Sequence, residues 1–264
     1  MKTTRSVTTI ILTLIWPFLV MGQQISITPV PLPVDRFLTN IVGICQDSQG
    51  FIWLADNYKG LMRYDGSQLK YFRSDPYKRN SLFTDRLECL APGQGGVIWI
   101  ASGNQGLDRY DTVLDSFTHF QHDPTDPASL SNNNIYALLE DREGMLWIGT
   151  HFGLDYLDPQ TGEFVHVSDQ TEAGLSLDSA IVRTIYEDQS GTIWLGCGHP
   201  FLPSLQKGGL YRLDKETQTI TKYSHQSNDP NTLTHHIVTA IYEDSRGTFW
   251  VGSAGDGLHT MDRE

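Results

Sequence analysis

The feature that most constrains the fold is a tryptophan that recurs along the chain at nearly constant steps. In this sequence of 264 residues, five of the six tryptophans are separated by 46, 48, 47 and 56 residues. A glycine stands three residues before each of the five, and a Gly-Leu pair and an aspartate follow after a short loop. A period of about 40 to 50 residues with strand-like patterning is typical of propellers and similar arrays. The recurring residues are Trp53, Trp99, Trp147, Trp194 and Trp250.

The third copy shows how one repeat divides into strands. Ile135–Glu140 is the first expected strand, and the segment 141–144 that follows fits a type I turn, with Asp first and Gly fourth. Further strands are expected at Met145–Gly149, Leu154–Asp158 and Glu163–Val167. Short strands separated by turn signals, with no helical period beyond the first residues of the chain, predict an all-β fold.

The predicted fold class is all-β, a β-propeller of four-stranded antiparallel blades. A four-stranded meander cannot bury both of its faces alone, and radial stacking lets each sheet pack on its neighbours. The last repeat lacks a fourth strand, so we expect four full blades and a partial fifth; alternatively, Ile25–Ile27 supplies the missing strand and closes a five-bladed ring. The expected blades are residues 38–73, 86–121, 134–168, 181–224 and, in part, 237–264.

The recurrent tryptophans have a structural interpretation in such a fold. Each indole would fill the gap between two adjacent sheets, where replacing a buried aromatic by alanine costs about 3–5 kcal/mol. We therefore expect Trp53, Trp99, Trp147, Trp194 and Trp250 to be core residues rather than a sugar-binding platform.

Charge and cysteine content exclude some functions. The formal net charge is −12, so a nucleic acid partner is not expected, because binding phosphates requires a basic face. The three cysteines, Cys45, Cys89 and Cys197, show no metal-ligand spacing and are interpreted as small buried hydrophobes. A disulfide between Cys45 and Cys89 is the alternative.

The N-terminus has the features of an export signal. Lys2 and Arg5 precede an apolar stretch from Val7 to Val20, which predicts a signal peptide over residues 1–22 and a mature start at Gln23. An uncleaved signal anchor is the alternative. Residues 23–37 contain three prolines and are expected to be extended, ahead of the repeats at 38–264. The protein is expected to be exported to the periplasm.

Candidate ligand-binding residues lie on one rim of the expected propeller. In an antiparallel meander, the loops between second and third strands share a face with the connections between blades, and these are the longer, variable segments. Binding residues concentrate on loops held by a rigid scaffold. An insertion near 198–208 makes the fourth copy distinctive, although a tolerated surface insertion is the alternative. The candidates are Asp56, Tyr58, Asn104, His151, His199, Phe201, His235 and Asp256.

No catalytic spacing accompanies these loops. The HExxH, GxSxG, P-loop and calcium-loop patterns are absent from the sequence. We therefore predict no catalytic residue, no metal site and no cofactor, while paired carboxylates for glycoside chemistry stay open without distances.

At the level of residues, the pattern resembles the two-component regulator propeller repeat. The family motif I-x-x-I-x-E-D-x-x-G-x-x-W-I-G-T-x-x-G-G-L-x-x-Y-D is matched by Ile135 to Leu154 and by Ile241 to Gly252. The connection typical of the family, N-D-P-x-x-x-x-S-L, is similar to the segments beginning at Ser74 and His122. Five copies span residues 38–264; the second departs at Ala91-Pro92-Gly93, and the fourth carries the insertion.

This resemblance implies the N-terminal periplasmic sensor region of a hybrid two-component histidine kinase of the Bacteroidetes type. The chain would then be a fragment of a larger, seven-bladed propeller, or the product of a truncated gene. Its partners would be a small-molecule or oligosaccharide ligand and the remaining sensor domains or a kinase. The resemblance also implies a homodimer. Two rival functions stay open: a propeller lyase acting on a polysaccharide or cyclic peptide, and a non-catalytic scaffold.

Overall fold

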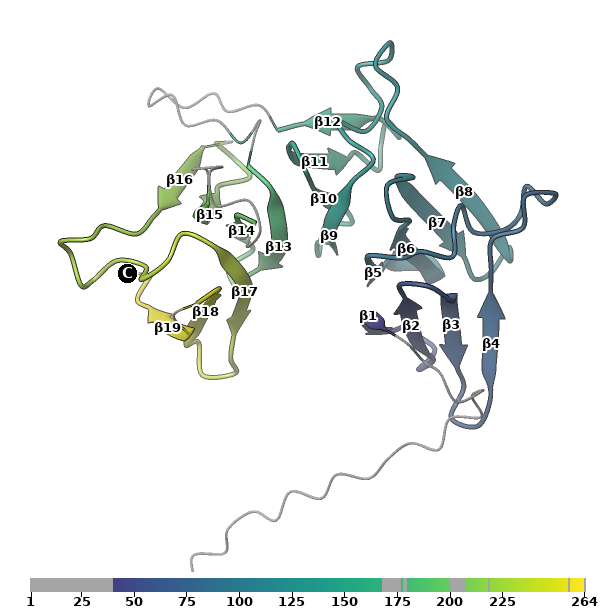
Figure 1. Cartoon of the computed structure of the whole chain (residues 1–264), viewed down its shortest axis with the longest axis horizontal. Coiled ribbons are helices and arrows are strands. Elements are labelled where there is room, and N and C mark those ends of the chain that lie inside the picture. Colours follow the sequence, from purple (N-terminus) through teal and green to yellow (C-terminus); the bar gives the residue numbers. More distant parts are fainter. Residues whose placement is uncertain are drawn as a thin grey trace, which may run out of the picture. The chain divides into compact units, whose positions relative to one another are not determined.

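The chain folds into five antiparallel sheets that follow one another in chain order (Figure 1). The computed structural model describes residues 40–167, 177, 180–199, 208–217, 219–255 and 257–263, all within one compact unit spanning Leu32–Glu264. The expected signal peptide at 1–22 and the extended segment at 23–37 lie outside the described residues.

Four of the sheets have four strands, and the last has three among the described residues. The first sheet comprises β1 (Ile41–Gln46), β2 (Ile52–Asp56), β3 (Gly60–Tyr64) and β4 (Leu69–Phe72). The second comprises β5 (Cys89–Pro92), β6 (Val97–Ala101), β7 (Leu107–Asp111) and β8 (Ser116–Phe120), with a 3-10 turn, Gln94–Gly96, between β5 and β6. The third comprises β9 (Ile135–Glu140), β10 (Leu146–Thr150), β11 (Gly153–Leu157) and β12 (Phe164–His166). The fourth and fifth comprise β13 (Val182–Glu187), β14 (Ile193–Cys197), β15 (Gly209–Leu213), β16 (Ile220–Tyr223), β17 (Val238–Glu243), β18 (Phe249–Ser253) and β19 (Gly257–Met261).

The predicted fold class is confirmed: these sheets are four full propeller blades and a partial fifth. The first strands of successive sheets, β1, β5, β9, β13 and β17, lie next to one another in that order. In the third sheet each predicted strand is found within one residue of its predicted bounds.

The turn before each tryptophan explains the recurring Asp and Gly. In the third sheet the Gly144 N–H donates to the Asp141 carbonyl at 3.0 Å, and Gly144 has a φ of 87°, which glycine adopts without strain. Asp141 Oδ1 accepts the N–H groups of Glu143 and Met145, each at 3.0 Å. Its Oδ2 accepts the indole Nε1–H of Trp147 at 2.9 Å. One carboxylate thus holds the turn and orients the indole.

The indoles of the first four sheets each pack between their own sheet and the next, whereas Trp250 of the fifth sheet is half-buried. Trp147, for example, lies in one core cluster with Val182 and Leu195 of the fourth sheet. Trp194 is 1% exposed and packs on Val238 and Phe249 of the fifth. The hydrophobic core is therefore a series of seams between neighbouring sheets.

A glutamate at the end of the first strand adds a polar clasp to three seams. Glu187 Oε2 accepts the backbone N–H of Arg142, in the turn of the preceding sheet, at 3.0 Å. Glu243 Oε2 accepts that of Gln189 at 2.8 Å. The third such bond joins the Gln94 N–H to Glu140 Oε1 at 2.6 Å. At the equivalent position of the second sheet stands Pro92, which cannot form such a bond.

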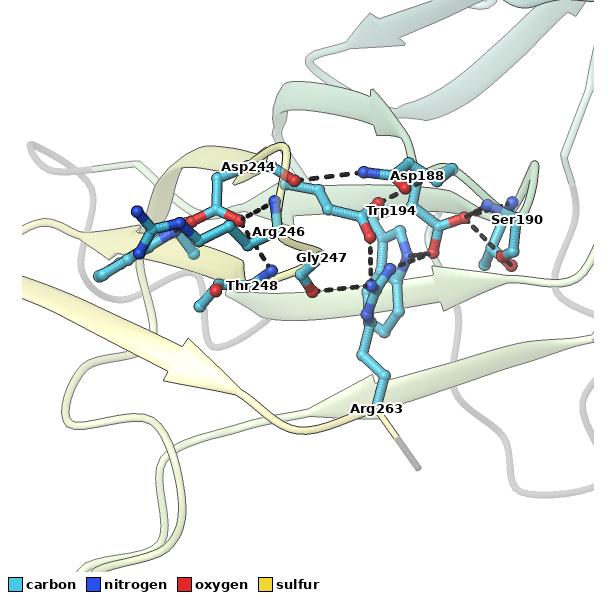
Figure 2. Close-up of polar contacts among 12 residues, drawn as sticks. Asp188, Ser190, Trp194, Asp244, Arg246, Gly247, Thr248 and Arg263 are labelled. Atoms are coloured by element: carbon cyan, nitrogen blue, oxygen red, sulfur yellow. Dashed lines mark hydrogen bonds and ion pairs between the residues drawn. The ribbon is translucent and has the colours of Figure 1, made fainter.

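A cation accompanies the clasp where two carboxylates meet. At the last seam Arg263 binds Asp188 at 2.8 Å beside the Trp194 indole (Figure 2). Arg263 also binds Glu243. In the preceding seam Lys215 Nζ lies 3.2 Å from Asp141 Oδ2 and 3.5 Å from Glu187 Oε1. The cation offsets the repulsion between carboxylates that lie close together away from water.

In the second and third sheets, a buried aspartate on the third strand fixes the segment that precedes the sheet. Asp108, fully buried, accepts the Phe83 N–H at 2.9 Å and the Ser102 hydroxyl at 2.7 Å, and pairs with His119 Nδ1 at 2.6 Å. The third sheet repeats the arrangement with Asp155 and His166. These interactions hold the connections at the loop rim.

The three cysteines are free thiols, so the alternative of a Cys45–Cys89 disulfide is not found. Cys197 is buried, and Cys45 and Cys89 are half-buried on their strands.

Candidate functional site

A β-bulge in the first strand of a sheet creates the most distinctive polar cluster on the loop rim. The pairing of β9 with β10 passes from Ala137 to Ile135, so Tyr136 is left without a partner. The pairing of β13 with β14 skips Arg183 in the same way. Bulges re-aim side chains and are frequent near binding sites. Here they place Tyr136 and Arg183 on neighbouring strands, beside the predicted loop residues.

His151 and His199 lie around the Tyr136 ring. The Tyr136 hydroxyl and His151 Nδ1 are 3.3 Å apart, and the two ring centroids are 6.2 Å apart. The His199 ring meets Tyr136 edge-on at 6.5 Å between centroids. The Arg183 guanidinium carbon lies 5.4 Å from the centre of the Tyr136 ring. The structure thus brings together two residues that the sequence predicted and two that it did not.

The electrostatics of this cluster favour a neutral His199. Burial lowers the pKa of His199 below its ordinary value of 6.5, and the positive charges of Arg183 and His151 lower it further. Burial raises the pKa of Tyr136 above 10.0, with Arg183 acting in the opposite direction. At neutral pH the cluster therefore presents the neutral imidazole of His199 and the phenol of Tyr136 beside the permanent positive charge of Arg183. Such groups can hydrogen-bond and stack on a polar ligand.

The other predicted residues are spread around the rim. Asp56 is fully buried, and its Oδ1 accepts the N–H groups of Tyr58 and Lys59 at 2.8 and 3.1 Å, so its carboxylate holds its own loop. Tyr58 is 66% exposed, and Asn104 is exposed in a different loop. His235 accepts the Ile237 N–H at 3.1 Å and lies 5.0 Å from the ring of His236.

Two further predicted residues cannot be placed. Phe201 and Asp256 lie outside the described residues, as do residues 200–207 of the insertion.

Sequence reasoning missed Tyr136 and Arg183 because it assumed strict alternation along the strand. Ile135 and Ala137 are both buried, which alternation predicts, but nothing in the pattern indicates that the residue between them lies in a bulge. One signal for these residues is present in the sequence, because the residue at this strand position differs between repeats. The equivalent positions of the first and fifth sheets carry Val42 and Thr239. A position that varies between otherwise matching copies is a candidate for recognition.

The described part of the chain lacks two features. It contains no group of three or more His, Cys, Asp or Glu side chains arranged to hold a metal ion. Nor does this part of the chain form any helix with the length and hydrophobicity needed to cross a membrane.

Sheets of this topology, joined by indole-filled seams, define a β-propeller repeat protein. Four segments, residues 37–58, 129–152, 176–199 and 232–255, match the sequence model of the two component regulator propeller family. These four segments are therefore two component regulator propeller repeats by sequence. No curated protein matches its sequence.

Solved structures agree with this assignment. The extracellular domain of a hybrid two component system from B. thetaiotaomicron is 27% identical, with a TM-score of 0.70 over 85% of this chain and 29% of that one. The chain thus spans less than a third of that relative. Virginiamycin B lyase from Staphylococcus aureus, 11% identical, has a TM-score of 0.59 over 86% of this chain and 71% of its own. That second likeness shows the propeller fold alone.

Proposed function

We propose that this chain is the ligand-sensing part of an exported two-component sensor, and that its ligand is carbohydrate-derived. The family match and the likeness to an extracellular domain support a sensor propeller. The observation that carries the proposal of a ligand site is the cluster of Tyr136, Arg183, His151 and His199 on the loop rim.

The chemistry of the cluster suits a polyhydroxylated ligand. An aromatic ring with a polar tip offers an apolar face to the C–H groups of a sugar and a hydrogen-bonding group to its hydroxyls. Arg183 adds donors in a fixed fork geometry, and the two imidazoles can each donate or accept. A kinase partner or further sensor domains would receive the signal, and a periplasmic location and a homodimer are part of the same proposal.

The proposal is tested by titrating the chain with a panel of neutral and acidic oligosaccharides in a calorimeter. Tyr136→Ala and Arg183→Ala should each weaken the best ligand at least tenfold, which corresponds to about 1.4 kcal/mol. Thr239→Ala, at the equivalent bulge of the fifth sheet, is the matched control and should bind as the parent chain does.

Two results would contradict the proposal. If the Tyr136 and Arg183 variants bind the ligand as tightly as the parent chain does, the ligand binds elsewhere. Steady formation of an unsaturated product from a polysaccharide would instead favour a lyase, since a sensor releases its ligand unchanged.

A further inference from the structure

The residue at the bulge position of the first strand differs in every sheet. In the second sheet this position directly precedes Cys89, which pairs with Ala101 as Ala137 pairs with Gly149. The first strands follow one another in space from β1 to β17, so these positions form a row along the loop rim. In chain order the row reads Val42, Glu88, Tyr136, Arg183 and Thr239. An aromatic ring thus stands between a carboxylate on one side and a guanidinium on the other.

The guanidinium of this row has no carboxylate partner among the described residues. Arg183 is half-buried, and its guanidinium carbon lies 5.4 Å from the centre of the Tyr136 ring. The carboxylate on the other side, Glu88, is already bound to Arg86, whose Nη2 lies 3.0 Å from Glu88 Oε1. Arg86 and Glu88 therefore compensate each other, and the charge of Arg183 stays uncompensated.

This charge outweighs the others that act on the cluster. Burial raises the pKa of Tyr136, and Arg183 is the charge that acts most strongly against this rise. Burial lowers the pKa of His199, and Arg183 again contributes more than the other nearby charge, that of His151. The formal net charge of the chain is −12, but at physiological ionic strength exposed charges more than about 8 Å apart are largely screened. A ligand at this part of the rim therefore interacts mainly with a positive charge.

An exposed aromatic ring adjoins the cluster. Phe152 is 53% exposed, and its ring meets that of His151 edge-on at 5.1 Å between centroids. The half-buried ring of Tyr136 lies on the same imidazole, at 6.2 Å between centroids. Aromatic side chains offer an apolar surface, and the phenol adds a polar tip. The rim thus combines one cation with apolar surface on which a sugar ring can lie.

We propose that the carbohydrate ligand carries a carboxylate, as a uronate residue does, and that Arg183 binds it and so selects acidic over neutral sugars. This inference rests on the proposed function of the same site. A guanidinium matches a carboxylate with two parallel hydrogen bonds, and such charge-assisted bonds are roughly twice as strong as neutral ones. The sugar ring lies against Tyr136 and Phe152, and the imidazoles of His151 and His199 bind its hydroxyls.

The test compares oligosaccharides that differ only in esterification. Trigalacturonate, a hyaluronan tetrasaccharide and the methyl ester of each are titrated into the chain in a calorimeter at physiological ionic strength. At least one of the two acids should bind, and it should bind more tightly than its ester by about a factor of ten or more, because the ester cannot form the charge-assisted pair.

Variants assign the preference to one side chain. Arg183→Met should weaken the acid until acid and ester bind equally, without changing the affinity for the ester. Arg183→Lys should keep part of the preference, because lysine keeps the charge but loses the fork of donors. Arg246→Met removes an exposed arginine from the turn between β17 and β18, on the opposite rim, and is the matched control. It should keep the full preference, and circular dichroism should show that all three variants are folded.

Four outcomes would count against one proposal or the other. If neither acid binds, or acid and ester bind equally to the parent chain, while a neutral oligosaccharide does bind, this inference fails and the proposed function stands. A preference for the acid that persists in Arg183→Met would also overturn the inference. If sodium acetate binds as tightly as the acidic sugar, the anion site stands and the carbohydrate ligand fails. If no oligosaccharide of either charge binds, both proposals fail.

Discussion

The indole Nε1–H of Trp99 donates a hydrogen bond to Glu140 Oε2 at 2.6 Å, which ties the second sheet to the third. In the other four sheets the indole is bound by an aspartate of its own turn, as Trp53 is by Asp47 at 2.7 Å. Gly93 replaces that aspartate in the second sheet, and the neighbouring sheet supplies the acceptor instead. The same carboxylate also accepts the Gln94 N–H, so one acid serves both bonds at this seam.

Replacing Gly93 should expose how tightly this arrangement is packed. A Cβ at Gly93 would lie 2.6 Å from Glu140 Oε2 and 2.8 Å from Trp99 Nε1. Gly93→Ala and Glu140→Ala should each lower the free energy of unfolding by about 1–3 kcal/mol, the first by overpacking and the second by leaving the Trp99 indole N–H without its acceptor.

The two changes should not be additive, because shortening Glu140 removes the nearest of the close contacts that the alanine methyl group would make. Urea unfolding of both single variants and the double variant measures the coupling. Glu163→Ala, an exposed glutamate, is the control and should change stability little. Strict additivity would show that Gly93 is not needed for the clasp.

Removing the cation of the next seam should destabilise the chain most at neutral pH. Lys215→Met leaves Asp141 and Glu187 facing each other without compensation, and we expect a loss of about 1–3 kcal/mol. Adding Glu187→Gln should recover part of that loss.

The acid side of the stability profile should change as well. Burial favours the neutral form of Asp141, but hydrogen bonds from Trp147 and Met145 and the charge of Lys215 lower its pKa below 3.8. The stability that this group contributes is therefore present above pH 3.8 and lost as the pH falls through the lowered pKa. Urea unfolding between pH 2 and pH 7 should show that acid lowers the free energy of unfolding less in Lys215→Met than in the parent chain. An equal loss in both chains would contradict this account.

His119 should give the opposite pH dependence. Its bond to Asp108 raises the pKa of His119 above 6.5, while burial acts against that rise. The contribution to stability is present below pH 6.5 and declines as the pH rises through the folded-state pKa. Thermal unfolding between pH 6 and pH 9 should show this decline, and His119→Gln should remove it. A decline of the same size in the variant would assign it to another group.

The ring of His199 reports directly on the candidate ligand site. Because Arg183 helps to lower the pKa of His199, Arg183→Met should raise that pKa towards 6.5. Titration of the imidazole signals by NMR measures the shift, and Arg142→Met, on a distant turn, serves as the control. An unchanged pKa would separate Arg183 from the cluster.

The thiols should be inert in the folded chain. Burial and the nearby charge of Asp47 raise the pKa of Cys45 to about 12, and burial with the charge of Glu88 raises that of Cys89 to about 12. Thiolate is the reactive form, so a disulfide-exchange reagent at pH 8 should label the native chain slowly and the unfolded chain at all three cysteines. Rapid labelling of one native thiol would contradict the packing described for it.

The amino-acid sequence by itself determined the repeat, the strands and the turn chemistry. Period, glycine position and aspartate position are local requirements: a turn needs a residue that tolerates positive φ, as Gly144 does, and an acceptor for its own amides, as Asp141 is. Such requirements involve residues within a few positions of each other, and their spacing can be read directly. The rim positions of His151 and His199 followed from the same meander.

The tertiary structure alone decided which side chains meet across the seams and at the bulges. The partner of Trp99 lies 41 positions away at Glu140, and nothing in the second copy indicates it. Tyr136 and Arg183 reach the loop rim because a bulge breaks the alternation of their strands, and a bulge depends on how two strands are paired. Contacts of this kind depend on the packing of one sheet against the next, which residue spacing within one repeat does not specify.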